Sequence, residues 1–324
     1  LAERLTKAAG MERAFFANSG AEAIEALLKL ARKHGTELGG PAKVEIVAAH
    51  NSFHGRTLGA VTATGQAKYS QPFKPLLPGI RHVPYGDVAA LQDAVGPQTA
   101  AVLLEVVQGE GGVKPAPAGF LEAARAVCDA HGALLMLDEV QTGFGRTGSL
   151  FAFQQLALMP DAIALAKGIA NGLPMGAMLC RGTAARALQV AEHATTFGGG
   201  LVTSHVALAV LDELEAPGFM DGVRARGEYL EAGLKALAER LGTRRVREVR
   251  GRGMMWGMVL QAPLSRRVME LAAAEFGLLV GGAGADVVRL TPPLVMTHAQ
   301  IDAVVARLEG ALHAAFAEAD AAAS

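Results

Sequence analysis

A lysine at the end of an apolar run is the first residue in this sequence whose type and setting suggest chemistry. Residues Ala162–Ala166 are all apolar, and Lys167 follows them directly. A lysine in such a setting must stay exposed, pair with a carboxylate or be used covalently, because burial disfavours its charged form. A desolvated lysine has a lowered pKa and becomes nucleophilic at neutral pH. We therefore interpret Lys167 as a candidate nucleophile.

A second apolar run, earlier in the chain, ends in an acid. Leu134–Leu137 is followed by Asp138, and Glu139, Val140 and Gln141 come next. Ligands of open α/β sheets bind at the carboxyl ends of the strands. An ionised Asp138 at that edge could keep a ring nitrogen of a cofactor protonated. The alternative interpretation is an acid that only caps the following loop.

The start of a predicted helix is the third candidate feature. Ser19 and Glu22 have the spacing of a capping box, and the small residues Gly20 and Ala21 lie between them. The free backbone N–H groups and partial positive charge of a helix N-terminus suit a phosphate dianion. Most such boxes only cap a helix, so the motif indicates a phosphate site only together with the lysine and the acid.

The elements that would carry these residues alternate between strand-like and helical patterns. Short apolar runs predict strands at Arg13–Ala17, Val44–Ala48, Ala100–Val107, Ala133–Leu137 and Ala162–Ala166. Between the third and fourth of these runs, Phe120–His131 has helical periodicity. This alternation predicts α/β units around a largely parallel sheet.

The last third of the chain has a different pattern. The Pro217–Gly218 pair indicates a boundary, so we expect a large domain at 1–216 and a smaller α+β domain at 217–324. Helical patterns cover Ser204–Glu215, Arg226–Leu241, Ser265–Phe276 and a final helix that begins at a capping box, Thr297–Gln300. Strand-like patterns cover Val246–Leu260 and Leu278–Leu290.

The composition excludes several classes of function. Of 324 residues, 51% are hydrophobic, and 30 basic and 31 acidic residues leave a formal net charge of -1. Such a balance does not attract nucleic acid or an anionic membrane. The sequence contains neither a bilayer-spanning apolar run nor a signal-peptide pattern. Cys128 and Cys180 lack the spacing of a zinc site or a disulfide framework, so we expect a cytoplasmic protein without a metal site.

The first residues predict a chain that begins inside a longer one. Leu1, Leu5 and Ala8 already have the apolar spacing of a helix. The helix stops at Gly10 and has no lead-in, so we expect further residues before Leu1.

The candidate residues belong to an ordered set of motifs that runs along essentially the whole chain. The motifs are Asn18–Ala23, Ser52–Thr57, Gln108–Gly112, Leu137–Gly143, Ala166–Gly168, Thr195–Gly199, Arg250–Met254 and Arg289–Pro293. This set resembles the class III, ornithine-type aminotransferases of fold type I, and the set is far more specific than any single motif. The resemblance implies a large domain with a mostly parallel sheet, a smaller α+β domain and pyridoxal 5′-phosphate as cofactor.

The resemblance also implies a role for each residue around the cofactor. The cofactor-binding residues that it implies are Ser19, Gly20, Ala21, Phe53, Asp138, Val140, Gln141, Lys167 and Thr196. Phe53 would stack on the cofactor ring, Asp138 would pair with the ring nitrogen and Gln141 would approach the ring hydroxyl. Lys167 would be the catalytic residue, which forms the Schiff base and then moves the proton between substrate and cofactor. Thr196 would reach the phosphate of the neighbouring subunit, which implies a homodimer.

The substrate-binding residues that the resemblance implies are Arg56, Glu110, Thr195 and Arg289. Arg56 and Arg289 resemble the family's two carboxylate-binding arginines, because a guanidinium can hold a carboxylate through two parallel hydrogen bonds. Glu110 resembles the glutamate that neutralises Arg289 when the amino donor has no carboxylate at that end. The alternative for each arginine is a surface salt bridge, and for Glu110 a structural role. His54 is interpreted as an ordinary hydrogen-bonding loop residue.

The motifs look most like the group within the family that acts on N-acetylornithine. The expected reaction transfers the ω-amino group of N-acetylornithine, or of a similar N-acylated diamino acid, to 2-oxoglutarate and gives a semialdehyde and glutamate. The alternatives are an aminotransferase of lysine biosynthesis that acts on carrier-bound aminoadipate semialdehyde, an ornithine or 4-aminobutyrate aminotransferase, and a non-catalytic α/β binding module. A dinucleotide-binding oxidoreductase is disfavoured, because Gly251–Gly257 lacks the GxGxxG spacing.

Overall fold

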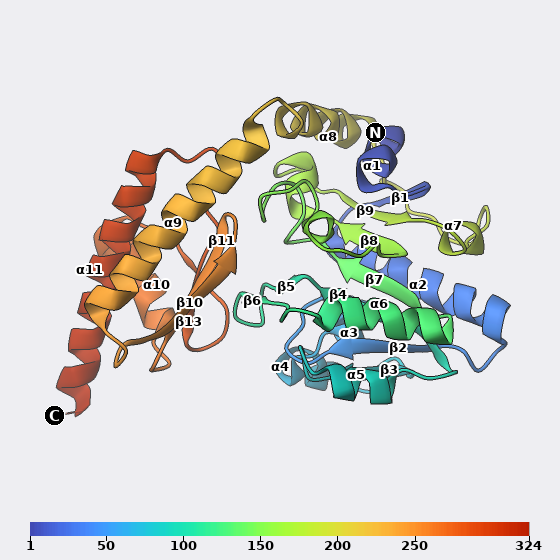
Figure 1. Ribbon diagram of the computed structural model, residues 1–324, viewed down its shortest axis with the longest axis horizontal. Coiled ribbons are helices and arrows are strands. Elements are labelled where there is room, and N and C mark those ends of the chain that lie inside the picture. Colours follow the sequence, from blue (N-terminus) through green and yellow to red (C-terminus); the bar gives the residue numbers. More distant parts are fainter. Residues whose placement is uncertain (324) are drawn as a thin grey trace. The chain divides into compact units, whose positions relative to one another are not determined.

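The computed structural model describes residues 1–323, and the chain divides into two compact units (Figure 1). The large unit comprises Leu1–Val106, Ala116–Phe144 and Ser149–Ala216, and the second comprises Val107–Pro115, Gly145–Gly148 and the chain from Pro217 onward. The main division therefore falls at the Pro-Gly pair. The two short segments of the second unit are not separated from the large unit by any pattern in the sequence.

The large unit is built on a seven-stranded sheet with the order β1-β9-β8-β7-β4-β2-β3. Its strands are β1 (Arg13–Ala17), β2 (Glu45–Ala49), β3 (Ile80–Val83), β4 (Thr99–Glu105), β7 (Leu134–Asp138), β8 (Ala162–Leu165) and β9 (Gly176–Cys180). Only β9 runs against the others, because it is antiparallel to both of its neighbours, β1 and β8. The five predicted strands are present, whereas β3 and β9 were not predicted.

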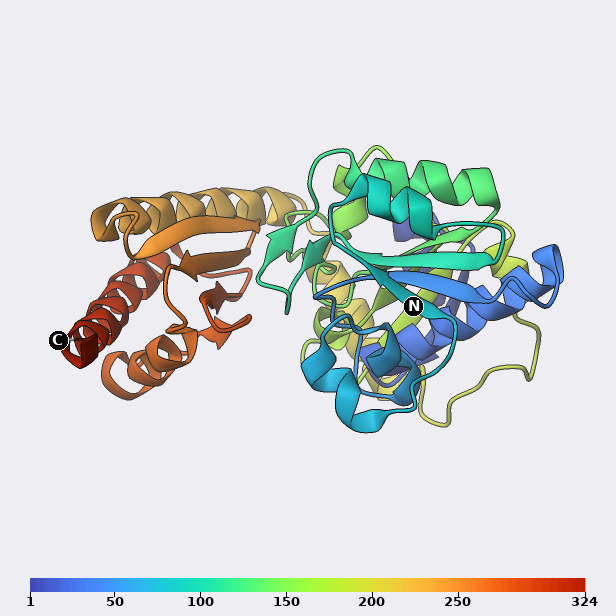
Figure 2. The same cartoon turned by 90° about the horizontal axis from the view of Figure 1, so that it is seen from below.

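Helices cover both faces of this sheet (Figure 2). On one face lies α2 (Gly20–Gly39), whose buried residues include Ile24, Leu27 and Leu30 and pack in one cluster with residues of the central strands. On the other face lie α5 (Val88–Ala94) and α6 (Phe120–His131). The remaining helices of the unit are α1 (Ala2–Ala9), α3 (Leu58–Ala63), α4 (Ala67–Ser70), η1 (Gln71–Phe73), η2 (Ala152–Gln155), η3 (Lys167–Ala170), α7 (Ala184–Ala187) and α8 (Leu201–Leu214).

The second unit has a four-stranded antiparallel sheet, ordered β10-β11-β13-β12, with three long helices. Its elements are β5 (Val107–Gln108), β6 (Lys114–Pro115), α9 (Phe219–Leu241), β10 (Val246–Arg252), β11 (Met255–Leu260), α10 (Ser265–Phe276), β12 (Gly281–Gly282), β13 (Val287–Leu290) and α11 (His298–Ala323). Each of the two strand-like stretches predicted here is a pair of strands joined by a turn. The predicted capping box at α11 is confirmed, since Thr297 Oγ1 accepts from the Gln300 N–H at 3.3 Å and Gln300 Oε1 accepts from the Thr297 N–H at 2.8 Å.

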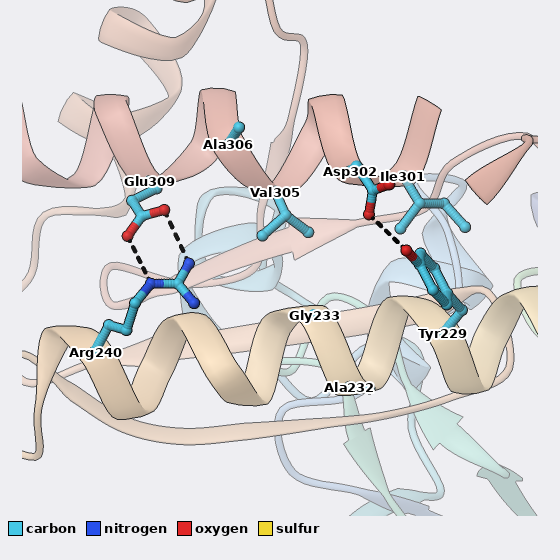
Figure 3. Close-up of a pocket in the computed structure, with 9 residues that line it drawn as sticks. All are labelled: Tyr229, Ala232, Gly233, Arg240, Ile301, Asp302, Val305, Ala306 and Glu309. Atoms are coloured by element: carbon cyan, nitrogen blue, oxygen red, sulfur yellow. Dashed lines mark hydrogen bonds and ion pairs between the residues drawn. The ribbon is translucent and has the colours of Figure 1, made fainter. Parts of the chain in front are cut away.

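Helices α9 and α11 enclose a groove of about 350 Å³ on the second unit (Figure 3). The helices approach closely at Gly233, where a Cβ would lie 3.2 Å from Val305 Cγ2. Polar pairs close the two ends of the groove. The Tyr229 hydroxyl donates to Asp302 at 2.8 Å, and the Arg240 guanidinium donates two hydrogen bonds of 2.9 Å to Glu309. These contacts fix α9 against α11.

No helix among the described residues is both long and apolar enough to cross a membrane.

Candidate active site

The carboxyl ends of β7 and β8 bring the predicted acid and lysine onto neighbouring strands. Asp138 is the last residue of β7 and is paired in register with Ala164 of β8, and Lys167 begins the 3₁₀ turn that follows β8. Lys167 has a φ of 47°, a left-handed conformation that is uncommon for a residue with a side chain. Such conformations are frequent at functional sites. The surrounding protein leaves the Lys167 side chain exposed, so the desolvation that the sequence suggested is not found in the chain itself.

Two hydrogen bonds hold the carboxylate of Asp138, which is only 5% exposed. Its Oδ1 accepts from the Val140 backbone N–H at 2.9 Å, and its Oδ2 lies 2.8 Å from His54 Nδ1. Burial alone would lower the pKa of His54, but the hydrogen bond and charge of Asp138, together with the charge of Glu105, raise it above its usual value. His54 is a hydrogen-bonding loop residue, as the sequence predicted, but the sequence did not identify its partner, the buried carboxylate of Asp138.

The start of α2 differs from the predicted capping box in one respect. Ser19 Oγ accepts from the Glu22 N–H at 3.2 Å, as expected. The Glu22 carboxylate, however, accepts from the backbone N–H and the side-chain amide of Asn18, both at 2.8 Å. Glu22 therefore holds Asn18, the residue before the N-cap Ser19. Helix α2 begins at Gly20 with two small residues.

The helix start, the acid and the lysine converge at Gly20. A Cβ at this position would lie 2.9 Å from Val140 Cγ1 and 3.5 Å from Ala166 Cβ. The first turn of α2 thus packs between the residue that binds Asp138 and the residue that precedes Lys167. A glycine is needed for this approach, because contacts below about 3.0 Å require a neighbour to shift.

A glycine also places the loop that contains Phe53 and Arg56. Gly55 has a φ of 134°, and a Cβ there would lie 2.7 Å from the Ala21 Cβ. The loop therefore lies against the first turn of α2. His54 reaches Asp138 from this loop, and the Phe53 N–H points toward Glu105 Oε2 at 3.4 Å. Phe53 and Arg56 are in this way brought close to the proposed phosphate site.

Two aromatic rings lie close to the guanidinium of the exposed Arg56 side chain. The Arg56 guanidinium carbon lies 4.1 Å from the ring centroid of Tyr69 and 5.6 Å from that of Phe53. The two rings meet edge to face, with centroids 5.5 Å apart and planes at 81°. Tyr69 was not singled out in the sequence, because nothing in its local pattern distinguishes it from a packing residue.

The Glu139 carboxylate organises the loop after Asp138 from the protein interior. Its oxygens accept from the Thr142 hydroxyl at 2.5 Å and from the backbone N–H groups of Ala152 and Phe153 at 3.0 and 2.8 Å. Burial raises the pKa of Glu139, although these hydrogen bonds oppose the shift. Gln141, half-buried, lies within the turn that Glu139 stabilises. Glu139 is a structural residue that the sequence alone did not identify.

The segment with Thr195 and Thr196 lies near the start of α2 in its own chain. The Asn18 side-chain amide donates to Thr195 Oγ1 at 2.9 Å, and Gly198 packs directly against the backbone of Phe16. Thr195, predicted to touch substrate, therefore supports the loop before α2 in this structure. Thr196 is exposed, and the neighbouring Phe197 is 80% exposed.

Within the second unit, the other predicted arginine is paired with the predicted glutamate. Arg289 Nη1 donates to Glu110 Oε1 at 2.6 Å, with the side chains 17% and 26% exposed. Arg289 projects from β13, and the loop of Glu110 is held by the Arg250 side chain, which donates to the Gly112 carbonyl at 2.9 Å. The pair that the motifs suggested across 179 residues is thus formed.

Arg146 fixes the segment that follows Arg289. Its guanidinium donates to the backbone carbonyls of Met254 at 2.9 Å and Pro292 at 2.6 Å. Burial lowers the pKa of Arg146 to about 10. The two carbonyl acceptors replace hydrogen bonds to water that the buried guanidinium has lost. No sequence signal identified this residue.

The sequence as a whole matches a known family. A family model described as aminotransferase class III covers residues 1–312. The chain belongs to the class III aminotransferases. This assignment explains why a lysine, an acid and a small-residue helix start converge at the edge of the sheet.

Three individual comparisons agree with the family assignment. The acetylornithine aminotransferase of Myxococcus xanthus is 49% identical over 302 residues, which are 93% of this chain and 75% of that protein. The crystal structure of N-acetylornithine aminotransferase from Stenotrophomonas maltophilia matches with a TM-score of 0.84 and 37% identity, over 98% of this chain and 79% of that one. An ornithine aminotransferase structure from Toxoplasma gondii, with partial occupancy of PLP at its active site, matches with a TM-score of 0.91 and 30% identity over 98% and 76% of the two chains.

These comparisons confirm the predicted fold class, since the large unit has the mostly parallel sheet of fold type I aminotransferases. Class III aminotransferases use pyridoxal 5′-phosphate. The residues of this chain fit that cofactor on structural grounds. A helix start made of small residues suits the phosphate, and a buried, hydrogen-bonded carboxylate next to a strand-end lysine suits the ring and the aldehyde carbon.

Proposed function

We propose that this class III aminotransferase transfers the ω-amino group of N-acetylornithine, or of a similar N-acylated diamino acid, to 2-oxoglutarate. The observation that carries the proposal is the packing of Gly20 against Val140 and Ala166, which unites the helix start with the strand ends of Asp138 and Lys167. The proposal for the donor is supported by the 49% identity to an acetylornithine aminotransferase over most of the chain.

When bound, pyridoxal 5′-phosphate stabilises the carbanion that forms when the substrate loses a proton. Lys167 Nζ would bind the cofactor aldehyde and then carry the proton between the amine-bearing carbon and the cofactor. Positioned proton transfer of this kind contributes about 10²- to 10⁴-fold to a rate. Asp138, held by His54 and the Val140 N–H, would keep the ring nitrogen protonated.

The other cofactor residues would orient the ring and the phosphate. The N–H groups of Gly20 and Ala21, with the Ser19 hydroxyl, would bind the phosphate at the positive end of α2. Phe53 and Val140 would hold the ring, and Gln141 would donate to its hydroxyl. The Ser19 hydroxyl already accepts a hydrogen bond as the helix cap, so its own proton is the part available to a phosphate oxygen.

The substrate would be oriented by its charged groups. Arg56 would bind a carboxylate in both half-reactions, because no acidic residue in the described part of the chain, 1–323, forms an ion pair with it. Arg289 would bind the second carboxylate of glutamate or 2-oxoglutarate, and Glu110 would pair with Arg289 when the donor has no charge at that end. The 2.6 Å contact between Glu110 and Arg289 supports this switch. Thr195 remains a proposed substrate contact.

We also propose that the working form is a homodimer in which Thr196 reaches the cofactor phosphate of the neighbouring subunit. Three apolar side chains within six residues of Thr196 support this, since Phe197, Leu201 and Val202 are 80%, 90% and 72% exposed. Sedimentation of the purified protein would test the dimer, and a Thr196→Ala variant should bind the cofactor more weakly without dissociating.

The decisive experiment compares amino donors in the presence of 2-oxoglutarate. N-acetylornithine should give a higher kcat/KM than ornithine or 4-aminobutyrate, because ornithine carries a free α-amine in place of the acylamino group, and 4-aminobutyrate is one carbon shorter and has no acylamino group. A preference for ornithine or 4-aminobutyrate would contradict the proposed donor. A preference for a carrier-bound aminoadipate semialdehyde as amino acceptor would instead favour a role in lysine biosynthesis. Absence of turnover with every donor would favour a binding module.

Lys167→Ala is the matched test of the catalytic residue. The variant should lose turnover below detection, because both the covalent attachment point and the proton carrier are removed. Borohydride should fix the cofactor to a lysine in the unmodified protein and not in the variant, as measured by mass spectrometry of the peptides. A reducible lysine adduct that persists in the variant would refute the assignment.

A further inference from the structure

The strongest feature outside the roles assigned so far is the tyrosine that lies against Arg56. Tyr69 is half-buried in the short helix α4, and its ring centroid is 4.1 Å from the Arg56 guanidinium carbon. An aromatic ring therefore packs against an arginine that is exposed. The question is what this contact does for the arginine.

The backbone that carries Arg56 is fixed on both sides. Gly55 packs against Ala21 in the first turn of α2. On the other side, the Thr57 hydroxyl donates to Glu25 Oε1 at 2.5 Å, and the same oxygen accepts from the Gly59 N–H at 2.9 Å. The Cα position of Arg56 is therefore determined by α2, the helix that begins at the proposed phosphate site.

The helix that carries Tyr69 is tied to the same loop. The Gln66 side chain donates to the backbone carbonyls of Asn51 and Ser52 at 3.2 and 3.3 Å, and the Tyr69 N–H donates to the Gln66 carbonyl at 3.0 Å. The Ser52 hydroxyl accepts from the Gly65 N–H at 3.0 Å. Tyr69 is thus held at a set position relative to Phe53 and Arg56, and does not sit on an independent flap.

A neutral ring restrains an arginine without neutralising it. A free arginine side chain loses rotamer entropy when it is ordered, and a cation–π contact with a tyrosine face offsets part of that loss. The guanidinium keeps its charge and the N–H donors that a carboxylate would bind. Among residues 1–323, no carboxylate forms an ion pair with Arg56, whereas Arg289 is paired with Glu110.

We propose that Tyr69 is a positioning residue that orders Arg56 for a substrate carboxylate and keeps it unneutralised, so that Tyr69 sets the affinity for dicarboxylates. The inference rests on the proposed function, in which Arg56 binds that carboxylate. Phe53 completes the arrangement, because its ring meets Tyr69 edge to face and also lies 5.6 Å from the guanidinium carbon. The Phe53 ring, which would stack on the cofactor, therefore also contributes to the orientation of Arg56.

A second cation lies near the same ring and provides an internal control. Lys68 Nζ is 4.6 Å from the Tyr69 centroid. If the ring served mainly to pack Lys68, loss of the tyrosine would not affect a ligand of Arg56. Lys68 is exposed, and Lys68→Ala should therefore leave dicarboxylate binding within about twofold of the unmodified protein.

The test measures binding of glutarate to the cofactor-loaded protein by calorimetry, because glutarate has the two carboxylates of 2-oxoglutarate but no keto group to react. Tyr69→Leu should raise the glutarate Kd by about 3- to 30-fold, the range expected for loss of a cation–π contact. Tyr69→Phe retains the ring and should stay within about twofold. In turnover, Tyr69→Leu should raise the KM for 2-oxoglutarate more than it lowers kcat.

A double-mutant cycle separates positioning from general structural damage. In an Arg56→Ala background, Tyr69→Leu should have no further effect on glutarate binding, because the group that it orders is absent. Tyr69→Met serves as a second variant if the leucine variant does not fold. Wild-type affinity in a folded Tyr69→Leu or Tyr69→Met variant would overturn the inference. So would an equal loss in Tyr69→Phe, or a full loss that persists without Arg56.

The two proposals fail in different ways. If the unmodified protein binds glutarate through Arg56 and Tyr69 but does not transaminate N-acetylornithine, the donor is wrong and the role of Tyr69 stands. If the unmodified protein transaminates N-acetylornithine but Arg56→Ala binds glutarate normally, the proposed activity stands and the role of Tyr69 is overturned.

Discussion

The two units hold their proposed carboxylate-binding arginines in opposite ways. In the large unit, the guanidinium carbon of Arg56 lies 4.1 Å from a tyrosine ring, which leaves its charge intact. In the second unit, Arg289 donates to the Glu110 carboxylate at 2.6 Å. A charge next to a ring is always available to a ligand, whereas a charge in an ion pair becomes available only when its partner leaves.

The difference corresponds to two requirements of a ping-pong reaction. One site must accept an amino donor and then a keto acid whose charges lie at different distances. A permanently charged arginine suits the carboxylate that both substrates share, and a switchable one suits the carboxylate that only one of them carries. The comparison therefore predicts that the two arginines respond differently to the same substitution.

The largest expected effect comes from removing the two guanidinium groups in turn. Arg56→Ala should lower kcat/KM by about 100-fold or more for both N-acetylornithine and 2-oxoglutarate, because charge-assisted hydrogen bonds contribute about 1.5–3 kcal/mol each. Arg289→Ala should lower kcat/KM mainly for 2-oxoglutarate and glutamate. Steady-state kinetics of both half-reactions would measure this.

Arg247→Ala is the matched control for these two variants, since Arg247 forms an exposed pair with Asp286 at 2.6 Å. It should retain activity toward both substrates. Equal losses for both substrates in Arg289→Ala would remove the distinction between the two arginines.

An intermediate effect is expected when Arg289 is left unneutralised. Glu110→Gln preserves the size of the side chain but removes its charge, so a donor that is neutral at that end must be bound beside an uncompensated cation. The KM for N-acetylornithine should rise by about 10-fold, while the KM for glutamate should fall or stay unchanged. Initial rates with each donor at saturating acceptor would show this.

Glu318→Gln is the control for the glutamate substitution, because Glu318 of α11 pairs with Arg267 of α10 at 2.6 Å and both side chains are exposed. Its kinetic constants should match those of the unmodified protein. A Glu110→Gln variant whose KM rises equally for both donors would indicate that Glu110 only supports the loop.

The chemistry-bearing residues could be found in the sequence because each ends a recognisable element. Lys167 and Asp138 follow apolar runs, and the strand boundaries place them within one residue of the predicted positions. The missing strands show the limit of this signal. β9 is a short apolar run that contains a glycine, and β3 is an edge strand with exposed positions, so neither has a periodicity that separates it from a loop.

The residues that support the site could not be predicted, because their partners are distant in the sequence. His54 meets Asp138 across 84 residues, and Arg146 meets Pro292 across 146 residues. Gly20 and Gly55 are required by atoms of Val140 and Ala21 that approach only in the folded chain. Local patterns describe elements, whereas these contacts depend on how the elements pack.

The smallest expected effect tests whether ion pairs in the second unit stabilise it or serve function. Arg240 donates two hydrogen bonds to Glu309 at the end of the groove between α9 and α11, and the two side chains are 52% and 28% exposed. Exposed pairs of this kind contribute little to stability even when both bonds form. Arg240→Ala should therefore leave all kinetic constants unchanged and lower the thermal midpoint by about two degrees or less.

A core substitution in the same helix calibrates that measurement. Leu234 is fully buried in α9, and Leu234→Ala should cost about 2–5 kcal/mol of folding free energy. The scan rate, cofactor and protein concentration must be the same for all variants, because each shifts the apparent midpoint. If Arg240→Ala lowered the thermal midpoint as far as Leu234→Ala does, ion pairs would contribute strongly to the stability of the second unit. The pairing of Arg289 with Glu110 could then no longer be attributed to substrate exchange on the basis of its geometry.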